Sequence, residues 1–216
     1  MKYIFLLLIL INFNASYAQT QKDNIVNERL GNIQEKKLTK APTEGHYYLT
    51  DDKVKLTILR IDSSLLENVV ARYNLRDDLF ETEGLKLLGS GVLTFSHNEE
   101  QYVRSSLVNE YFALKDQFCK VIYRGIYEFY ATQEVTFMPS NYNVILDTGN
   151  RADTYVQNST YYLFSNGELM LKSNSTKKIA KYLRSNHKSL VDFIKKRNLS
   201  GTEGDVYSML QYIENI

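Results

Sequence analysis

The chain has 216 residues, with 26 lysines and arginines, 25 aspartates and glutamates, and a formal net charge of +1. This balance excludes a general nucleic-acid-binding protein, which needs a basic footprint to displace counterions from phosphates. A single cysteine excludes an internal disulfide and a cysteine-based metal site, so the fold depends on hydrophobic packing. Seventeen tyrosines and only two prolines favour a sheet-rich body.

Residues 1–18 have the pattern of a secretory signal peptide. Lys2 gives a positive start, and residues 4–11 form an unbroken apolar run that is too short to span a bilayer as a permanent helix. Ser16 and Ala18 are the small residues of a cleavage site, so we expect cleavage after Ala18. The sequence therefore predicts an extracytoplasmic protein, periplasmic, surface-bound or secreted, with no transmembrane segment in the mature chain.

The mature chain is expected to be one domain that follows a polar arm. Residues 19–42 are lysine-rich and only weakly periodic, which indicates a linker or a loosely docked arm. Residues 43–216 are predicted to form a single α+β domain, with strands mainly in 43–173 and a helical tail in 174–216. Its expected architecture is an antiparallel sheet of hairpins packed with one central helix, followed by about three short helices.

The first part of this domain is expected to hold a hairpin and the central helix. Segment 46–50 is rich in strand-forming residues, and in segment 53–58 lysine or threonine alternates with apolar residues. The two aspartates between these segments indicate a turn. Ser64 and Glu67 match a capping box, in which the hydroxyl and the carboxylate satisfy free backbone donors at the start of a helix. The apolar positions at a spacing of four on one helix face are Leu65, Val69 and Tyr73.

A run of strands is predicted next. Residues 92–95 and 102–103 indicate two strands joined through a polar turn. Residues 118–123 and 126–138 are rich in Tyr, Phe, Val and Thr, with a bend between them at Gly125. A further strand is expected over 142–146.

The chain ends in a tight hairpin and helices. Asn166 and Gly167 stand between two strand-forming segments in 161–171 and supply the positive φ angles of a tight turn. From residue 174 onwards apolar residues follow helical spacing, with a break near Ser185 and Asn186 and a cap at Thr202. The apolar residues of this tail are Ile179, Leu183, Leu190, Val191, Ile194, Val206, Met209, Leu210 and Ile213.

Three segments together resemble a group of exported proteins found in flavobacteria and other Bacteroidetes. They are the early Gly-His-Tyr-Tyr segment 45–54, the central strand pair 118–130, and the lysine-rich tail that follows the Tyr-Tyr-Leu hairpin in 161–216. The resemblance implies an exported α+β protein. It implies no catalytic residue, because the group has no established activity.

Asp147 is the one weak catalytic candidate. Residues 144–149 read Val-Ile-Leu-Asp-Thr-Gly, which resembles the catalytic loop of aspartic proteases, where two aspartates share a proton and activate water. No second Asp-Thr-Gly or Asp-Ser-Gly occurs, so such an enzyme would need a twofold dimer. Asp, Thr and Gly are also ordinary turn formers, and a turn after the strand is the favoured interpretation.

No cofactor or metal site is expected. His46, His97 and His187 lie in three different predicted elements and have no metal-ligand or triad spacing. The acidic run Asp77, Asp78, Glu81 and Glu83 lacks the ligand spacing and central glycine of a calcium loop. Cys119 lies in a strand-like run and is expected to be a buried, inert thiol.

The tail carries a concentration of positive charge. Between residues 172 and 197 nine lysines and arginines are opposed only by Asp192. Four of them follow helical spacing and define a basic stripe: Lys177, Lys181, Arg184 and Lys188. The stripe could bind an anionic glycan, a lipid headgroup or an acidic protein, although a solvated helix face explains the same pattern without a partner.

These observations favour a non-enzymatic envelope or secreted protein that binds or scaffolds another component. Its partner would be a protein or an envelope component, anionic if the basic stripe makes the contact. Two alternatives stay open: a dimeric aspartic-type hydrolase that uses Asp147, and a peripheral protein that adsorbs on an anionic envelope surface through its tail.

Overall fold

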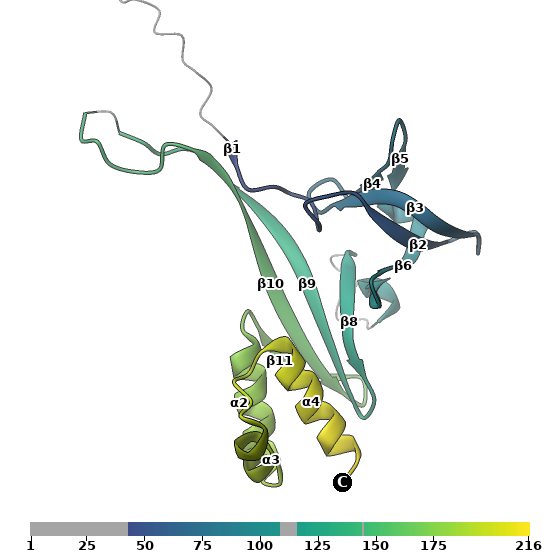
Figure 1. The fold of residues 1–216 in the computed structure, drawn as a ribbon, viewed down its shortest axis with the longest axis vertical. Helices are drawn as coiled ribbons and strands as arrows, with labels where there is room; N and C mark the ends of the chain where they lie inside the picture. Colours follow the sequence, from purple (N-terminus) through teal and green to yellow (C-terminus); the bar gives the residue numbers. More distant parts are fainter. Residues whose placement is uncertain (1–42, 109–115, 144) are drawn as a thin grey trace, which may run out of the picture. The chain divides into compact units, whose positions relative to one another are not determined.

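The computed structural model describes residues 43–108, 116–143 and 145–216, which form an α+β fold (Figure 1). The predicted signal peptide and polar arm, residues 1–42, lie outside the described residues. Within the described residues the chain forms an eleven-stranded sheet and three α-helices. None of the helices in this part of the chain is long and apolar enough to cross a bilayer.

The sheet is antiparallel except where β1 and β10 pair in parallel. Its strands run in the order β1-β10-β9-β8-β7-β6-β2-β3-β4-β5, and β11 pairs with β10. The strands are β1 (Thr43–Glu44), β2 (Val54–Arg60), β3 (Leu65–Asn74), β4 (Leu79–Glu81), β5 (Lys86–Leu88), β6 (Val92–His97), β7 (Glu100–Arg104), β8 (Phe118–Arg124), β9 (Tyr127–Met138), β10 (Asp153–Ser165) and β11 (Glu168–Ser173).

The predicted central helix is wrong, because residues 65–74 form strand β3. The Ser64 hydroxyl does not cap a helix. It donates to the Asp62 carboxylate at 2.6 Å inside the turn that joins β2 to β3. A spacing of four also fits one face of a strand, whose side chains alternate with a period of two. The β-branched pair Val69 and Val70 favours a strand, and β2 and β4 supply its hydrogen-bonding neighbours.

The predicted first hairpin is also wrong, because β2 pairs with β3 and β6 and not with residues 46–50. That segment instead follows the end of β3. The Leu49 N–H donates to the Tyr73 carbonyl at 2.9 Å, and the Leu75 N–H donates to the Tyr47 carbonyl at 2.9 Å. The Gln157 amide of β10 donates to the Tyr48 carbonyl at 2.7 Å. The segment therefore links β3 to β10, although these strands are far apart in the order of the sheet.

The later strand predictions are confirmed, with one exception. The two strands around residues 92–103 are β6 and β7, and the pair around Gly125 is β8 and β9. The turn between β10 and β11 has positive φ angles of 52° at Asn166 and 78° at Gly167, as the tight-turn pattern predicts. The described residues of the strand expected over 142–146, which are 142, 143, 145 and 146, belong to no strand: an isolated bridge joins Asn143 to Thr148 in the connection between β9 and β10.

The helical tail is confirmed as three helices: α2 (Thr176–Asn186), α3 (Leu190–Arg197) and α4 (Glu203–Glu214). Thr202 caps α4 as predicted: its side chain accepts from the Asp205 N–H, and the Asp205 side chain accepts from the Thr202 N–H. Apolar residues of the helices pack with Phe129 of β9 and Leu163 of β10 in one core cluster. A second core cluster, rich in aromatic rings, lies under β2, β3, β4, β6 and β8.

Candidate functional site

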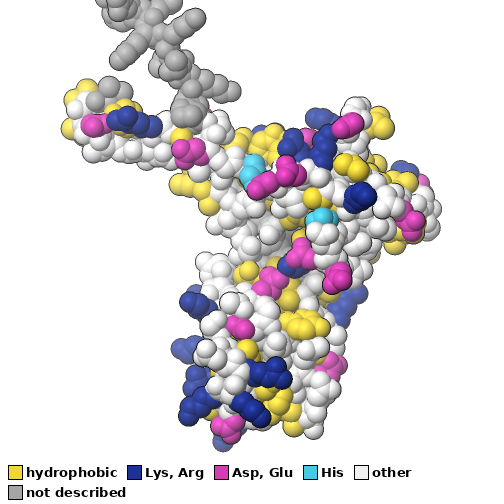
Figure 2. All heavy atoms as spheres, viewed as in Figure 1, with side chains coloured by type: hydrophobic (Ala, Val, Ile, Leu, Met, Phe, Trp, Pro, Cys, Tyr) yellow, Lys and Arg dark blue, Asp and Glu magenta, His cyan; other side chains and the backbone are white. Residues whose placement is uncertain are grey.

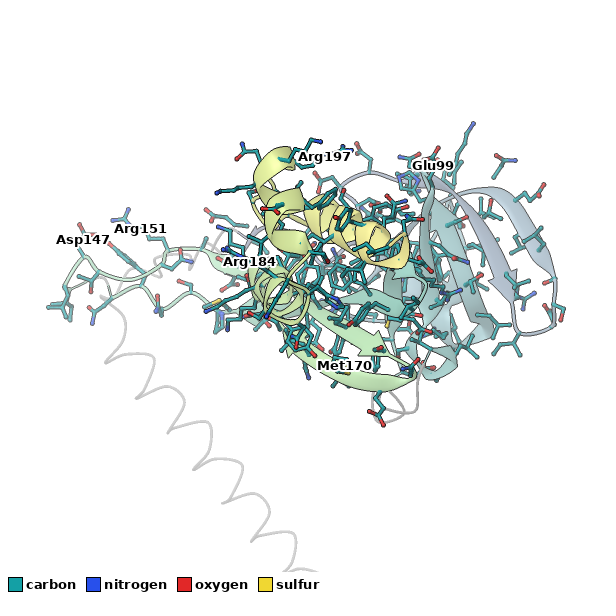
Figure 3. All side chains as sticks on the ribbon, turned by 90° about the horizontal axis from the view of Figure 1, so that it is seen from below. Glu99, Asp147, Arg151, Met170, Arg184 and Arg197 are labelled. Carbon is teal, nitrogen blue, oxygen red and sulfur yellow. The ribbon has the colours of Figure 1, made fainter. Side chains whose placement is uncertain are left out.

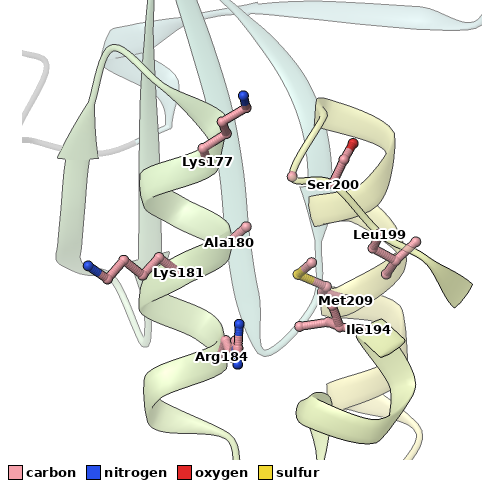
Figure 4. A pocket seen from close by; sticks show the side chains of 9 residues that line it. Lys177, Ala180, Lys181, Arg184, Ile194, Leu199, Ser200 and Met209 are labelled. Atoms are coloured by element: carbon pink, nitrogen blue, oxygen red, sulfur yellow. The ribbon is translucent and has the colours of Figure 1, made fainter. Parts of the chain in front are cut away.

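The strongest candidate site is a cavity in the helical tail, which we call the tail cavity (Figure 4). It has a volume of about 330 Å³ and lies between α2 on one side and α3, α4 and the segment that joins them on the other. Four apolar side chains line it: Ala180, Ile194, Leu199 and Met209. Three cationic side chains line it as well: Lys177, Lys181 and Arg184. Ser200 and Gly201 complete the lining.

The sequence of α2 explains why a cavity remains there. Ile179 and Leu183 are fully buried in the core that the tail shares with the sheet. Ala180 lies on the neighbouring face, and its short side chain leaves the space open. Gly201 has a φ of +93°, and a Cβ added to it would lie 3.3 Å from the Lys177 Cα. A glycine at this position therefore allows the segment that precedes α4 to approach α2 closely.

The cations of the tail cavity have no acidic partner within the described residues. Lys177, Lys181 and Arg184 are exposed, and none of the ion pairs of the described chain includes them. Lys177 and Arg184 lie seven residues apart, which is about 10 Å along a helix, at the two ends of the cavity (Figure 4). The Lys181 side chain points away from the gap in the same view.

Three of the four residues of the predicted basic stripe therefore share one helix and one cavity. Lys188 does not join them, because α2 ends at Asn186 and Lys188 lies in the turn before α3. Figure 2 shows further lysine and arginine side chains over the helical tail. The apolar lining was not apparent from the sequence. The one sequence feature that pointed to this lining is the small apolar residue Ala180, which stands between basic residues on the helix.

Polar contacts fix the tail on the sheet. The Lys120 ammonium of β8 lies 2.6 Å from the Glu203 carboxylate of α4 and 2.7 Å from the Glu100 carboxylate of β7. The Tyr127 hydroxyl of β9 forms a 2.8 Å hydrogen bond with His187. These contacts and the shared apolar core hold the helices that form the cavity walls.

Asp147 lies elsewhere, in the exposed loop between β9 and β10, where Figure 3 shows it beside Arg151. Its carboxylate accepts hydrogen bonds from the Tyr142 hydroxyl and, at 2.6 Å, from the Arg151 guanidinium. These two hydrogen bonds, that from Tyr142 first, lower the pKa of Asp147. The side chain is 73% exposed. In one copy of the chain it is thus an ionised, arginine-paired carboxylate, and a proton shared with a second aspartate would require a second copy.

The other candidate residues lie apart or are already paired. His46, His97 and His187 belong to separate parts of the fold, near Asp51, Asn98 and Tyr127 respectively. Cys119 is buried, and this burial raises the pKa of its thiol to about 12, which makes it unreactive.

The first two residues of the acidic run, Asp77 and Asp78, are paired with arginines. Asp77 pairs with Arg76 at 2.7 Å and Asp78 pairs with Arg104 at 2.9 Å. Across residues 43–108, 116–143 and 145–216, no group of three His, Cys, Asp or Glu side chains is placed to hold a metal ion.

Comparison of the chain with protein-family models, with curated proteins and with solved structures found no match.

Proposed function

We propose that this chain is an extracytoplasmic, non-enzymatic binding module that holds an anionic partner at its helical tail. The observation that carries the proposal is the tail cavity, where Lys177 and Arg184 stand at the two ends of an apolar lining without a carboxylate partner among the described residues. The signal-peptide pattern of residues 1–18 supports the location outside the cytoplasm.

The physical argument concerns cations that folding leaves uncompensated. An ion pair between exposed side chains contributes little to the stability of a protein. The fold therefore loses little stability when exposed cations such as these have no partner. They create a local positive potential that attracts an anionic partner and speeds its association. Because the cavity walls are fixed by the core and by the Lys120 contacts, binding requires little ordering of the tail.

Adsorption of the whole tail on an anionic surface is the second candidate. It is favoured by the excess of basic residues between positions 172 and 197, where Asp192 is the only acidic residue. Adsorption of this kind depends on the number of charges near the surface, at about 1 kcal/mol for each lysine or arginine. Binding at the tail cavity depends instead on the particular cations that line it, so removal of other cations of the tail should have little effect.

The test compares two triple variants of the mature chain for retention on vesicles that contain anionic lipid. The cavity variant carries Lys177→Gln, Lys181→Gln and Arg184→Gln. The matched control carries Lys178→Gln, Lys195→Gln and Lys196→Gln, which removes the same charge from exposed positions of the tail outside the cavity. Circular dichroism melting verifies that both variants fold.

We expect the cavity variant to lose retention at least about tenfold and the control to stay within about threefold of the wild type. Equal losses in the two variants would instead favour adsorption of the tail by charge alone. Retention of the cavity variant at the wild-type level would refute the tail cavity as the binding site.

A further inference from the structure

We propose that the tail cavity binds a monomeric single-chain amphiphile that has a carboxylate head group, with the head group at the Lys177 end and the apolar chain along the lining. This inference rests on the proposed function of the tail and names the ligand class of the same site. It is carried by the composition of the lining and by the difference between the first turns of α2 and α4.

The lining selects a ligand that is both apolar and anionic. Ala180, Leu199 and Met209 provide apolar surface, and the cationic residues lie at the edges of the same cavity. A small inorganic anion would leave the apolar surface uncovered, and a hydrocarbon would leave the cations unused. A volume of about 330 Å³ lies at the small end of the range for ligand cavities. One chain of moderate length with one acidic head group matches these properties.

The first turns of two helices differ near the Lys177 end. In α4 the positive end of the helix dipole is offset by Glu203 and Asp205, and Thr202 caps the backbone. The α2 helix has no acidic residue in its first turn, and its N-cap residue, Ser175, makes no side-chain capping bond. Lys177 adds a further positive charge there. The first turn of α2 is therefore the position in the tail cavity where an anion gains most.

Two polar groups near this end, the Asp205 carboxylate and the Ser200 hydroxyl, are already engaged within the loop before α4. The Asp205 carboxylate accepts from the backbone N–H groups of Ser200, Gly201 and Thr202, each at 2.9 Å. The hydrogen bonds from Thr202 first and then from Ser200 lower the pKa of Asp205 to about 2, as expected for a carboxylate that accepts several hydrogen bonds from its own loop. The Ser200 hydroxyl donates to the same carboxylate at 3.0 Å. Lys177 is left as the side-chain donor for a head group.

Arg184 differs from Lys177 in its position on the helix. It lies in the last turn of α2, where its positive charge offsets the negative end of the helix dipole. Because the negative end of the dipole partly neutralises this charge, Arg184 attracts an anionic ligand less strongly than Lys177 does. Removal of Lys177 should therefore weaken binding of the amphiphile more than removal of Arg184.

The experiment follows the methyl signals of ¹³C-labelled methionines during titration of the mature chain with monomeric decanoate. Met209 lines the cavity, whereas Met138 and Met170 lie on β9 and β11 and serve as internal controls. Acetate tests the head group alone, and decanol tests the chain alone. We expect decanoate to shift the Met209 signal in a saturable way, with the other two signals unchanged. Acetate and decanol should bind at least about tenfold more weakly.

Two conservative variants test the orientation of the ligand. Lys177→Gln should weaken decanoate binding at least about tenfold, and Arg184→Gln should weaken it less than about threefold. Equal binding of decanoate and decanol, or a larger effect at Arg184, would overturn the proposal. Tighter binding of a peptide that ends in a leucine carboxylate would overturn the amphiphile as the occupant. If decanoate leaves Met209 unchanged while the vesicle test still depends on the cavity cations, the proposed function stands and the amphiphile fails.

Discussion

Arg104 in the sheet and the cations of the tail cavity differ in burial and in their partners. Arg104 of β7 is 5% exposed, donates to Asp78 at 2.9 Å and lies 4.0 Å above the centre of the Phe118 ring. Lys177 and Arg184 of the tail are exposed, and no described carboxylate pairs with them. The fold would lose stability if the buried Arg104 lost its partners, because a buried charge without a partner is costly. The exposed cations contribute nothing of this kind, so their charge stays available to a ligand.

Two further ion pairs lie between these extremes. Lys120 is 22% exposed and joins the sheet to α4 through Glu203. Arg151 is 68% exposed and pairs with Asp147 in the loop between β9 and β10. If burial decides what an ion pair contributes, loss of the Arg104 pair should have the largest effect on stability and loss of the Arg151 pair the smallest.

Asp78→Ala tests the buried end of this comparison. It leaves the Arg104 guanidinium buried without its carboxylate and removes the acceptor of the Tyr73 hydroxyl, which donates to Asp78 at 2.6 Å. Asp78 itself is 40% exposed, so we expect a loss of about 2–3 kcal/mol in the free energy of unfolding, below that of a fully buried pair. Urea unfolding at neutral pH measures it.

Arg184→Gln is the matched control in the same assay, because it removes a cation that has no described acidic partner. Its free energy of unfolding should stay within about 0.5 kcal/mol of the wild type. Similar losses in the two variants would show that burial of the cation does not separate the sheet from the tail.

Lys120→Met tests the intermediate pair. Burial would raise the pKa of Glu100, but the hydrogen bonds from Lys120 and Tyr102 and the Lys120 charge hold it below its ordinary value. A carboxyl whose folded pKa is lowered stabilises the protein above its unfolded pKa of about 4.5, and this contribution disappears as the pH falls through the folded pKa. We expect the variant to lose about 1 kcal/mol at pH 7, and the difference from the wild type to shrink below about pH 4.5.

Urea unfolding at a series of pH values between about 3 and 7 measures this dependence. Lys55→Met, at an exposed position of β2, is the control and should show no such dependence on pH. A difference between Lys120→Met and the wild type that is constant over this range would contradict the role of Glu100 and Glu203 as partners.

The local features of the fold could be predicted from the sequence. Asn166 and Gly167 set the β10–β11 turn through their own φ angles, and Thr202 caps α4 through residues three positions away. The helix predicted at Ser64 was wrong because its signals are ambiguous at short range. A hydroxyl followed by a carboxylate also fits a strand that follows a turn, and a spacing of four fits both a helix face and a strand face. Residues 65–74 form a strand because they pair with β2 and β4. This pairing involves residues outside the segment, so the pattern within the segment does not reveal it.

The candidate site could be predicted in part for the same reason. The spacing of Lys177, Lys181 and Arg184 on α2 is a local property that the sequence displays. The cavity requires Leu199 from the segment between α3 and α4 and Met209 from α4, and its existence depends on how three helices pack. The pair of Asp78 with the buried Arg104 joins residues 26 positions apart, so no local sequence pattern predicts it.

Asp147→Ala tests the exposed end of the comparison, where we expect the smallest effect. The Asp147–Arg151 pair lies in an open loop, and solvent screens such pairs strongly. The urea midpoint and the vesicle retention of the variant should therefore equal those of the wild type. Peptidase assays with and without pepstatin complete the test, because a shared-proton aspartate pair from two copies of the chain would lose its activity with Asp147. A pepstatin-sensitive activity that disappears in Asp147→Ala would replace the binding module with a dimeric hydrolase.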